Sequence, residues 1–133
     1  MLTDILSNAD LKVMRAPAAL TAATINSSYV DLGDQVRPAQ VLLAVGALGG
    51  ETCTVSKVTV ADDSSGTGAT DLTLADVRVG NIGALGDGDL EIDVDNEVLV
   101  LQFTATKRYC RVTVVSTGTG PAAIYSIGAK TGR

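Results

Sequence analysis

The stretch Thr104–Val115, TATKRYCRVTVV, sets three bases and a tyrosine into a run rich in β-branched residues. Such residues favour strands, in which successive side chains point to opposite faces. One face then carries Arg108, Cys110, Val112 and Val114, and the other carries Lys107, Tyr109, Arg111 and Thr113. We therefore expect an apolar core face and a cationic outer face. Arg108 would lie where the strand begins, with its guanidinium able to reach solvent or a carboxylate.

The outer face of this strand has two interpretations. It is either a solvated face on which the tyrosine shields the backbone, or a surface that contacts another protein. Tyrosine and arginine are enriched among the residues that dominate protein interfaces. Lys107, Tyr109 and Arg111 are therefore candidate interface residues.

Stretches with β character also flank this strand, with turn residues between them. Residues Val41–Val45 form an apolar run bounded by proline and glycine, which indicates a strand buried on both faces. Residues Val98–Leu101 are apolar at both parities and predict a second central strand. A tight turn is expected just before it, at Asp95-Asn96.

The alternation along residues 52–60, TCTVSKVTV, changes phase in the middle. Apolar residues before Ser56 fall on one parity and those after Lys57 on the other. A bulge or bend near Ser56-Lys57 is therefore predicted, because side chains alternate faces along a strand. The next residues, 61–71, read ADDSSGTGATD and predict a polar loop.

About eight short strands without a helix of ordinary length predict an all-β fold, an antiparallel β-sandwich of jelly-roll type. A chain of 133 residues is expected to hold one domain, here residues 16–133. Residues 1–15 are predicted to be an N-terminal arm or edge segment. They form either an edge strand after a frayed tip or an arm that docks on a neighbour. Candidate contact residues in this segment are Leu2, Ile5, Leu6 and Lys12.

The charge balance bears on possible partners. A formal net charge of −5 makes nucleic acid an unfavourable partner, because an acidic surface repels phosphates. No apolar run approaches the roughly 20 residues that cross a bilayer, and the first residues lack the basic and apolar regions of a signal peptide. We therefore expect synthesis in a cytosol, where Cys53 and Cys110 are buried free thiols rather than a disulfide.

Acidic residues concentrate in one part of the chain. Residues 87–97 contain no base and hold Asp87, Asp89, Glu91, Asp93, Asp95 and Glu97. Alternation puts Glu91, Asp93 and Asp95 on the outer face of a half-buried strand. The spacing fails the calcium-loop pattern of an EF-hand, so no metal is expected. We call Lys107, Tyr109 and Arg111 the cationic ladder. The acidic residues of 87–97 and this ladder could pair within one sheet, or between copies of the chain in a head-to-tail ring.

The chemistry of common catalytic sites is missing. The chain contains no histidine, which removes the commonest general base and metal ligand. Two cysteines without histidine cannot form an ordinary zinc site, and no phosphate-binding glycine motif precedes a helix. We therefore expect a protein that is not an enzyme and carries no cofactor.

The order of several motifs resembles a known family. An opening SNADLKV leads to an Ala/Thr-rich strand, then to SSYVDLGD, AQVLLAVGAL and TCTVSKVTVADDSSGTGATDL. Last comes TKRYCRVTVV, which is similar to a KRYVRV strand with Cys110 in place of a valine. Over most of residues 7–128, the chain thus resembles bacteriophage capsid decoration (cement) proteins of β-sandwich type.

This resemblance implies a structural protein on the outer surface of an icosahedral phage head, made in the cytoplasm of a host bacterium. The major capsid protein would be one partner, and further copies of the chain, as a homotrimer, the other. The protein would stabilise the shell by bridging coat subunits, in some members through a terminal arm. The alternatives are a receptor- or glycan-binding module of a phage tail or fibre and, less consistent with the missing signal peptide, an adhesin or pilus-like domain.

Overall fold

The computed structural model describes residues 10–15, 18–19, 24–33, 37–48, 50–74, 77–82, 90–93, 95–116 and 123–131. These residues form strands joined by turns, without an α-helix. The all-β prediction is confirmed.

Twelve strands occur in the described part of the chain, and eight of them are three residues or longer. These eight are β1 (Asp10–Arg15), β3 (Thr24–Asn26), β5 (Arg37–Val45), β6 (Cys53–Ala61), β8 (Arg78–Ile82), β10 (Val98–Ala105), β11 (Tyr109–Ser116) and β12 (Ala123–Thr131). The two-residue strands are β2 (Ala18–Ala19), β4 (Val30–Asp31), β7 (Thr70–Asp71) and β9 (Glu91–Ile92).

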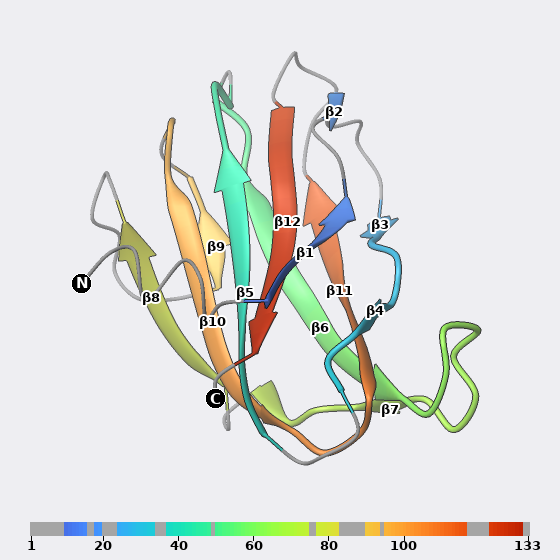
Figure 1. Ribbon diagram of the computed structural model, residues 1–133. Coiled ribbons are helices and arrows are strands. Elements are labelled where there is room, and N and C mark those ends of the chain that lie inside the picture. Colours follow the sequence, from blue (N-terminus) through green and yellow to red (C-terminus); the bar gives the residue numbers. More distant parts are fainter. Residues whose placement is uncertain are drawn as a thin grey trace.

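The strands form two antiparallel sheets that lie one in front of the other in Figure 1, as a β-sandwich. The first, which we call sheet A, has the order β1-β12-β5-β10-β8, and β2 also pairs with β12. The second, sheet B, has the order β3-β11-β6-β7, with β4 also on β11 and β9 also on β6. The pairing is nested along the sequence: β1 joins β12, β3 joins β11, β5 joins β10, and β6 joins β7.

The core lies between the sheets and is built from aliphatic side chains of both. Sheet A contributes Val41, Leu43, Leu99 and Leu101, and sheet B contributes Val55, Val58, Val60, Cys110, Val112 and Val114, each at most 1% exposed. Phe103 is the aromatic member, at 7% exposed. Aliphatic residues at alternate strand positions therefore fill the space between the two sheets.

The phase change in residues 52–60 is a β-bulge, as predicted. Thr113 of β11 pairs with Lys57, but the next residue, Val114, pairs with Val55. Ser56 is therefore the extra residue of β6, and its hydroxyl donates a hydrogen bond to the Thr113 carbonyl oxygen at 3.3 Å. Because of the bulge, apolar residues of both halves of β6 face the core.

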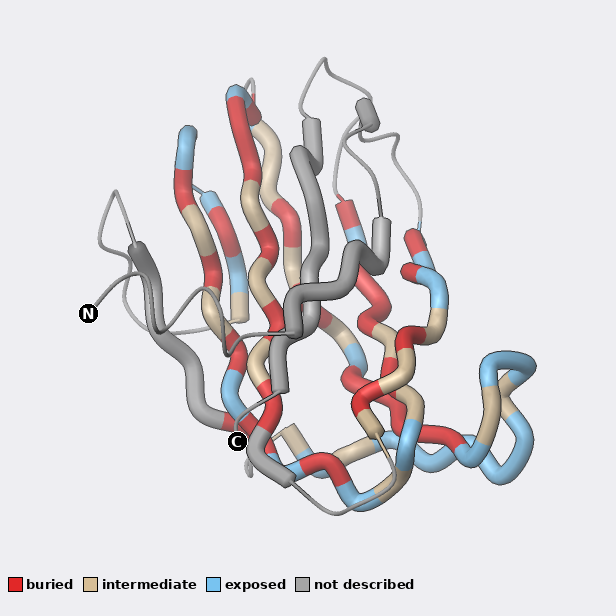
Figure 2. The backbone as a smooth tube through the Cα atoms, in the orientation of Figure 1, coloured by how far each residue is buried: buried red, intermediate tan, exposed pale blue. Residues whose placement is uncertain are grey.

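The prediction that residues 41–45 are buried on both faces is wrong for the described structure. Residues 41, 43 and 45 are buried, whereas Leu42 and Ala44 are only half-buried, and Figure 2 shows this alternation along β5. The interior position of β5 and β10 in sheet A is as expected. A strand in the interior of a sheet has both hydrogen-bonding edges paired, but each of its two faces is buried only where other residues pack on it.

Within the predicted segment 1–15, the structure describes residues 10–15. They form β1, an edge strand of sheet A that pairs with β12. Residues 1–9 lie outside the described part, and the domain boundary stays a prediction.

Candidate interaction surface

Strand β11 carries most of the TATKRYCRVTVV sequence, and its core face is as predicted, although Thr113 of the predicted outer face is only 5% exposed. Cys110, Val112 and Val114 are fully buried. Arg108, just before β11, donates hydrogen bonds from Nε and Nη2 to the two carboxylate oxygens of Asp31, at 2.8 and 2.7 Å. The expected contact of this guanidinium with a carboxylate is thus confirmed.

The predicted ladder residue Lys107 contacts the loop that joins β6 to β7. Its Nζ donates a hydrogen bond to the Gly68 carbonyl oxygen and lies 3.7 Å from Asp62 Oδ2. The lysine side chain is only 28% exposed. Lys107 therefore holds this loop against the end of the sheet.

The same loop, residues 62–69, is ordered by its own hydrogen bonds, although it projects from the sandwich in Figure 1. Asp63 Oδ1 accepts bonds from the backbone N–H groups of Ser65 at 2.9 Å and Thr67 at 3.0 Å. The Asp62 N–H donates to the Thr67 carbonyl oxygen at 2.8 Å. Hydrogen bonds from Thr67, above all, lower the pKa of the Asp63 carboxyl.

The second ladder residue, Arg111, stacks on an aromatic ring. Its guanidinium carbon lies 4.8 Å from the centroid of the Tyr29 ring, within the range of a cation–π contact. The same ring packs against the loop at Gly66, where an added Cβ would lie 3.1 Å from the tyrosine hydroxyl. Tyr29 thus connects the sheet to the loop.

A polar row continues from Arg111 across sheet B. Arg111 pairs with Thr59 of β6, and Thr59 pairs with Asp71 of β7. The Thr59 hydroxyl donates a 2.7 Å hydrogen bond to Asp71 Oδ1, and Lys57 Nζ lies 3.5 Å from Asp71 Oδ2. The bond from Thr59 lowers the pKa of Asp71 most, with smaller contributions from Lys57 and Arg111.

We call these residues the loop-end cluster. It comprises Tyr29, Asp31, Lys57, Asp62, Asp63, Asp71, Lys107, Arg108 and Arg111. Four cations lie among four carboxylates, so the cluster carries no excess charge in itself. Its cations contact groups of the same chain, and the cluster is pre-organised rather than strongly cationic.

The third ladder residue, Tyr109, is half-buried and lies beside this cluster. The guanidinium carbon of Arg108 is 5.7 Å from its ring centroid. Tyr109 pairs with Asp31 on one side and with Ala61 on the other. All three predicted ladder residues therefore lie at one end of sheet B.

Of the predicted acidic residues, Glu91 lies at the opposite end of that sheet, whereas Asp87 and Asp89 lie outside the described residues. Glu91 pairs with Thr54, whose hydroxyl donates to Glu91 Oε2 at 3.5 Å. Arg111 pairs with Thr59, about five residues or roughly 16 Å further along β6. Among the described residues, Glu91 and the ladder are therefore too far apart to pair within one sheet.

The residues after β9 correct part of the strand prediction. The strand ends at Ile92, and Asp93 is exposed. Asp95 Oδ1 accepts a 2.8 Å hydrogen bond from the Leu48 N–H, and Asn96 turns the chain with φ of 60°. The predicted turn is confirmed, but Glu97 is 1% exposed and belongs to no solvated acidic face.

The predicted arm contributes little that can be placed. Leu2, Ile5 and Leu6 lie outside the described residues. Lys12 occupies a position in the edge strand β1, paired with Ala129. Neither observation tests these residues as contacts.

The sequence patterns did not indicate several members of the loop-end cluster, above all Tyr29, Asp31 and Asp71. The DDSSG sequence suggests a local turn and could have indicated Asp63. No local signal connects Arg108 with Asp31, which is 77 residues away.

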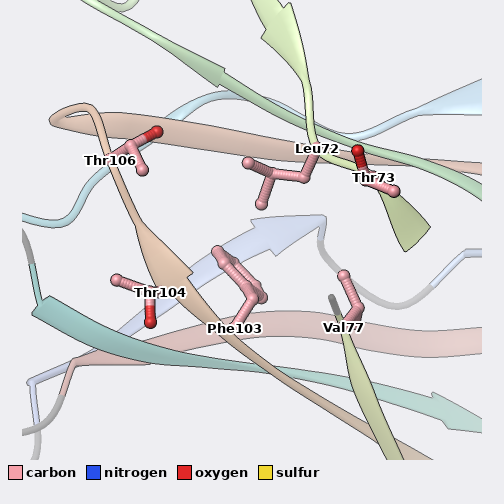
Figure 3. A pocket seen from close by; sticks show the side chains of 6 residues that line it. All are labelled: Leu72, Thr73, Val77, Phe103, Thr104 and Thr106. Atoms are coloured by element: carbon pink, nitrogen blue, oxygen red, sulfur yellow. The ribbon is translucent and has the colours of Figure 1, made fainter. Parts of the chain in front are cut away.

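A cavity of about 310 Å³ opens between residues that follow β7 and residues of β10. Its lining consists of Leu72, Thr73, Val77, Phe103, Thr104 and Thr106. In Figure 3, the side chains of Leu72 and Phe103 point toward one another. No ionisable side chain lines the cavity, so it offers apolar contacts and hydroxyl groups but no acid–base chemistry.

The two cysteines are free and buried, as predicted. Cys53 pairs with Ser116 and Cys110 pairs with Val60, so the thiols lie at opposite ends of the β6–β11 pair. Burial raises the pKa of each thiol to about 12. Neither thiol is therefore a reactive thiolate near neutral pH.

The described residues lack two further kinds of feature. They contain no group of three or more Cys, Asp or Glu placed to hold a metal ion. Within the same ranges, no helix has the length and apolarity to cross a membrane.

Comparison with known proteins found no matching family model, no matching curated protein and no matching solved structure.

Proposed function

We propose that this chain is a structural virion protein that binds the outer surface of an icosahedral phage capsid and stabilises it by bridging coat subunits. The nested strand pairing carries the proposal. The first strand pairs with the last, and the pairing continues inward to β6 with β7. This is the order expected when one long hairpin is rolled into two sheets. This order supports a jelly roll, an architecture that is frequent in viral capsid and lectin domains.

The pre-organised loop-end cluster also supports a binding role. An exposed loop buries little apolar surface to offset the entropy of its ordering. Here Lys107, Tyr29 and Asp63 fix residues 62–69 before any partner arrives. A loop that is already ordered loses less entropy when it binds.

The alternative, a glycan-binding module of a tail or fibre, has weaker support. Sugar sites commonly use exposed aromatic side chains, yet Phe103 beside the cavity is only 7% exposed. Tyr29 and Tyr109 are half-buried beside arginine side chains. Apart from Phe103, the cavity is lined by threonines and aliphatic side chains, which fit a glycan site less well than a protein contact.

The proposed mechanism is binding linkage. A protein that binds the mature shell but not its dissociated subunits stabilises the shell by mass action. Many copies on one lattice gain further from multivalent contact. We propose that copies associate, as a trimer, through Lys107, Tyr109 and Arg111 on one copy and Glu91, Asp93 and Asp95 on another.

The decisive experiment is the copy number of this protein relative to the major coat protein, by quantitative mass spectrometry of purified particles from its source. The proposal predicts a ratio of the order of coat-protein stoichiometry. A few copies per particle would favour a tail or fibre position. Absence from the particles would refute a virion role.

Charge reversal tests the contact between copies. Lys107→Glu with Arg111→Glu should lower the molecular mass in solution, measured by analytical ultracentrifugation, because both cations would be lost from the contact. Gln102→Glu, an exposed change on the outer face of sheet A, is the control. Unchanged mass of a folded double variant would refute this contact.

A further inference from the structure

One cation of the loop-end cluster differs from the others in its partners. Three cations each form an ion pair with a carboxylate of the cluster: Lys57 with Asp71, Lys107 with Asp62, and Arg108 with Asp31. The fourth, Arg111, makes no hydrogen bond or ion pair with the residues that the structure describes, and its Nε is buried without a hydrogen-bond partner. The hydrogen-bonding capacity of Arg111 is therefore left for a group outside the cluster.

The side chain of Arg111 is nevertheless held in place. Its guanidinium carbon lies 4.8 Å from the centroid of the Tyr29 ring. The loop packs against that ring, since an added Cβ at Gly66 would lie 3.1 Å from the tyrosine hydroxyl. The N–H groups of a guanidinium lie in its plane, so a ring over one face leaves them available to an acceptor. The planar fork of Arg111 is thus suited to a carboxylate, which accepts two parallel N–H bonds.

The stacking also bears on the strength of such a contact. An exposed ion pair contributes little, partly because two side chains lose rotamer freedom when they meet. Arg111 is already restrained by Tyr29 in the single chain. Less entropy is therefore lost when a carboxylate binds it, which is the general advantage of a pre-organised site.

Among the acidic residues predicted to contact another copy, Asp93 has the least committed carboxylate in the described structure. Glu91 accepts a hydrogen bond from the Thr54 hydroxyl at 3.5 Å, and Asp95 Oδ1 accepts one from the Leu48 N–H at 2.8 Å. Asp93 is exposed and has neither a hydrogen bond nor an ion pair within the described ranges. Its carboxylate and the Arg111 guanidinium are therefore complementary groups without partners.

The two side chains cannot meet within one chain. Arg111 pairs with Thr59, whereas Ile92, the residue before Asp93, pairs with Cys53. These positions are six residues or roughly 20 Å apart along β6. Figure 1 shows β9 and β7 at opposite ends of β6. A contact between two such separate surfaces on identical chains is head-to-tail and closes into a ring when the rotation allows it.

We propose that the guanidinium of Arg111 binds the carboxylate of Asp93 from the next copy of the chain. This inference rests on the contact between copies proposed above and selects one ion pair from it. In a trimer, the same pair would occur at each of the interfaces between neighbouring copies. Lys107 then acts mainly on its own loop, through Gly68 and Asp62.

Neutralisation of Asp93 tests the pair, because general repulsion and a specific contact predict opposite results. Asp93→Asn changes the formal net charge from −5 to −4, which lessens the repulsion between acidic chains and by itself favours association. Loss of the pair should instead raise the Kd of self-association about tenfold, measured by sedimentation equilibrium. Arg111→Gln should raise the Kd to a similar extent.

Two further variants make the comparison specific. Lys57→Gln is the matched control, because it removes a cation of the same sheet face that already pairs with Asp71. It should raise the Kd much less than Arg111→Gln does. Arg111→Asp combined with Asp93→Arg exchanges the two charges and should restore most of the association that either single change removes. Circular dichroism checks that each variant is folded.

The outcomes separate this pair from the broader proposals. A wild-type chain that stays monomeric would overturn the pair and the contact between copies, whereas capsid binding is decided by the copy number on particles. If Lys107→Glu with Arg111→Glu lowers the mass but Asp93→Asn leaves the Kd unchanged, the pair is wrong and the ladder contact stands. If Arg111→Gln lowers only the copy number on particles, a coat-protein carboxylate occupies Arg111 and the pair is again wrong.

Discussion

The outer faces of the two sheets differ in the contacts that their side chains make. On sheet B, the loop-end cluster joins cations, carboxylates and an aromatic ring through contacts within the chain. On sheet A, the outward side chains of β5 and β10 include the half-buried Leu42, Ala44, Val98 and Val100 and the exposed Gln102. Polar groups at a surface can be satisfied by their neighbours, whereas apolar groups are stabilised only by removal from water.

The largest expected effect is a difference in the free energy of unfolding between substitutions on the two faces of β5. Leu43→Ala should lower the free energy of unfolding by about 3 kcal/mol, because the side chain is fully buried in the core. Leu42→Ala, one residue away on the other face, should cost about 1 kcal/mol or less. Urea unfolding of both variants measures the difference. Equal losses would contradict the distinction between a core face and a half-buried outer face.

A smaller effect should distinguish the ordered loop of sheet B from an open turn. Gly68→Ala should cost about 2 kcal/mol, because φ is +64° and the new Cβ would displace the Asp62 carboxylate and approach Lys107 Nζ to 3.1 Å. Gly50→Ala, with φ of +87° and nothing within 4 Å, should cost about 1 kcal/mol. Chemical denaturation compares the two. An equal cost would mean that the contacts of Lys107 and Asp62 add nothing to the loop.

The smallest effect concerns pH. The pKa of Asp63 and of Asp71 is lowered in the folded chain, so ionisation of each carboxyl stabilises the fold above the unfolded pKa of about 3.9. This contribution should be lost as pH falls from about 4 through the lower folded pKa values. Amide exchange at Ser65 and Thr67 should therefore accelerate, beyond its intrinsic pH dependence, below about pH 4.

Asp63→Asn provides the control for the pH experiment. It should remove most of the extra acceleration at Ser65 and Thr67, because Asp63 Oδ1 accepts both bonds. An unchanged pH response in this variant would show that another group controls the loop.

Local patterns predicted the parts of the fold that depend on neighbouring residues. Parity alone assigned Cys110 and Val112 to the core and predicted a bulge or bend near Ser56-Lys57, which the structure has at Ser56, because a strand has a strict two-residue period. The same rule failed for Leu42, since apolar character at both parities does not say what covers the second face. Parity also missed the burial of Glu97, which follows a turn rather than a strand.

The candidate surface was only partly predictable. The ladder Lys107, Tyr109 and Arg111 was visible because it occupies a single strand. Its partners could not be identified, because Gly68 is 39 residues from Lys107 and becomes its neighbour only through the β6–β11 pairing. Such long-range contacts depend on strand order, to which a single strand contains no guide.

The Ser56 bulge has a consequence for how this chain can change in length. A single residue inserted or deleted elsewhere in β6 would invert the facing of every position between that point and the bulge. At Ser56 the strand pairing already accommodates two residues opposite one, so the loss of this serine would give continuous pairing with Lys57 outward and Val55 and Cys53 still facing the core. Within β6, a deletion should therefore be tolerated best at Ser56, and other insertions and deletions should be better tolerated in the loop at residues 62–69 than in either half of the strand.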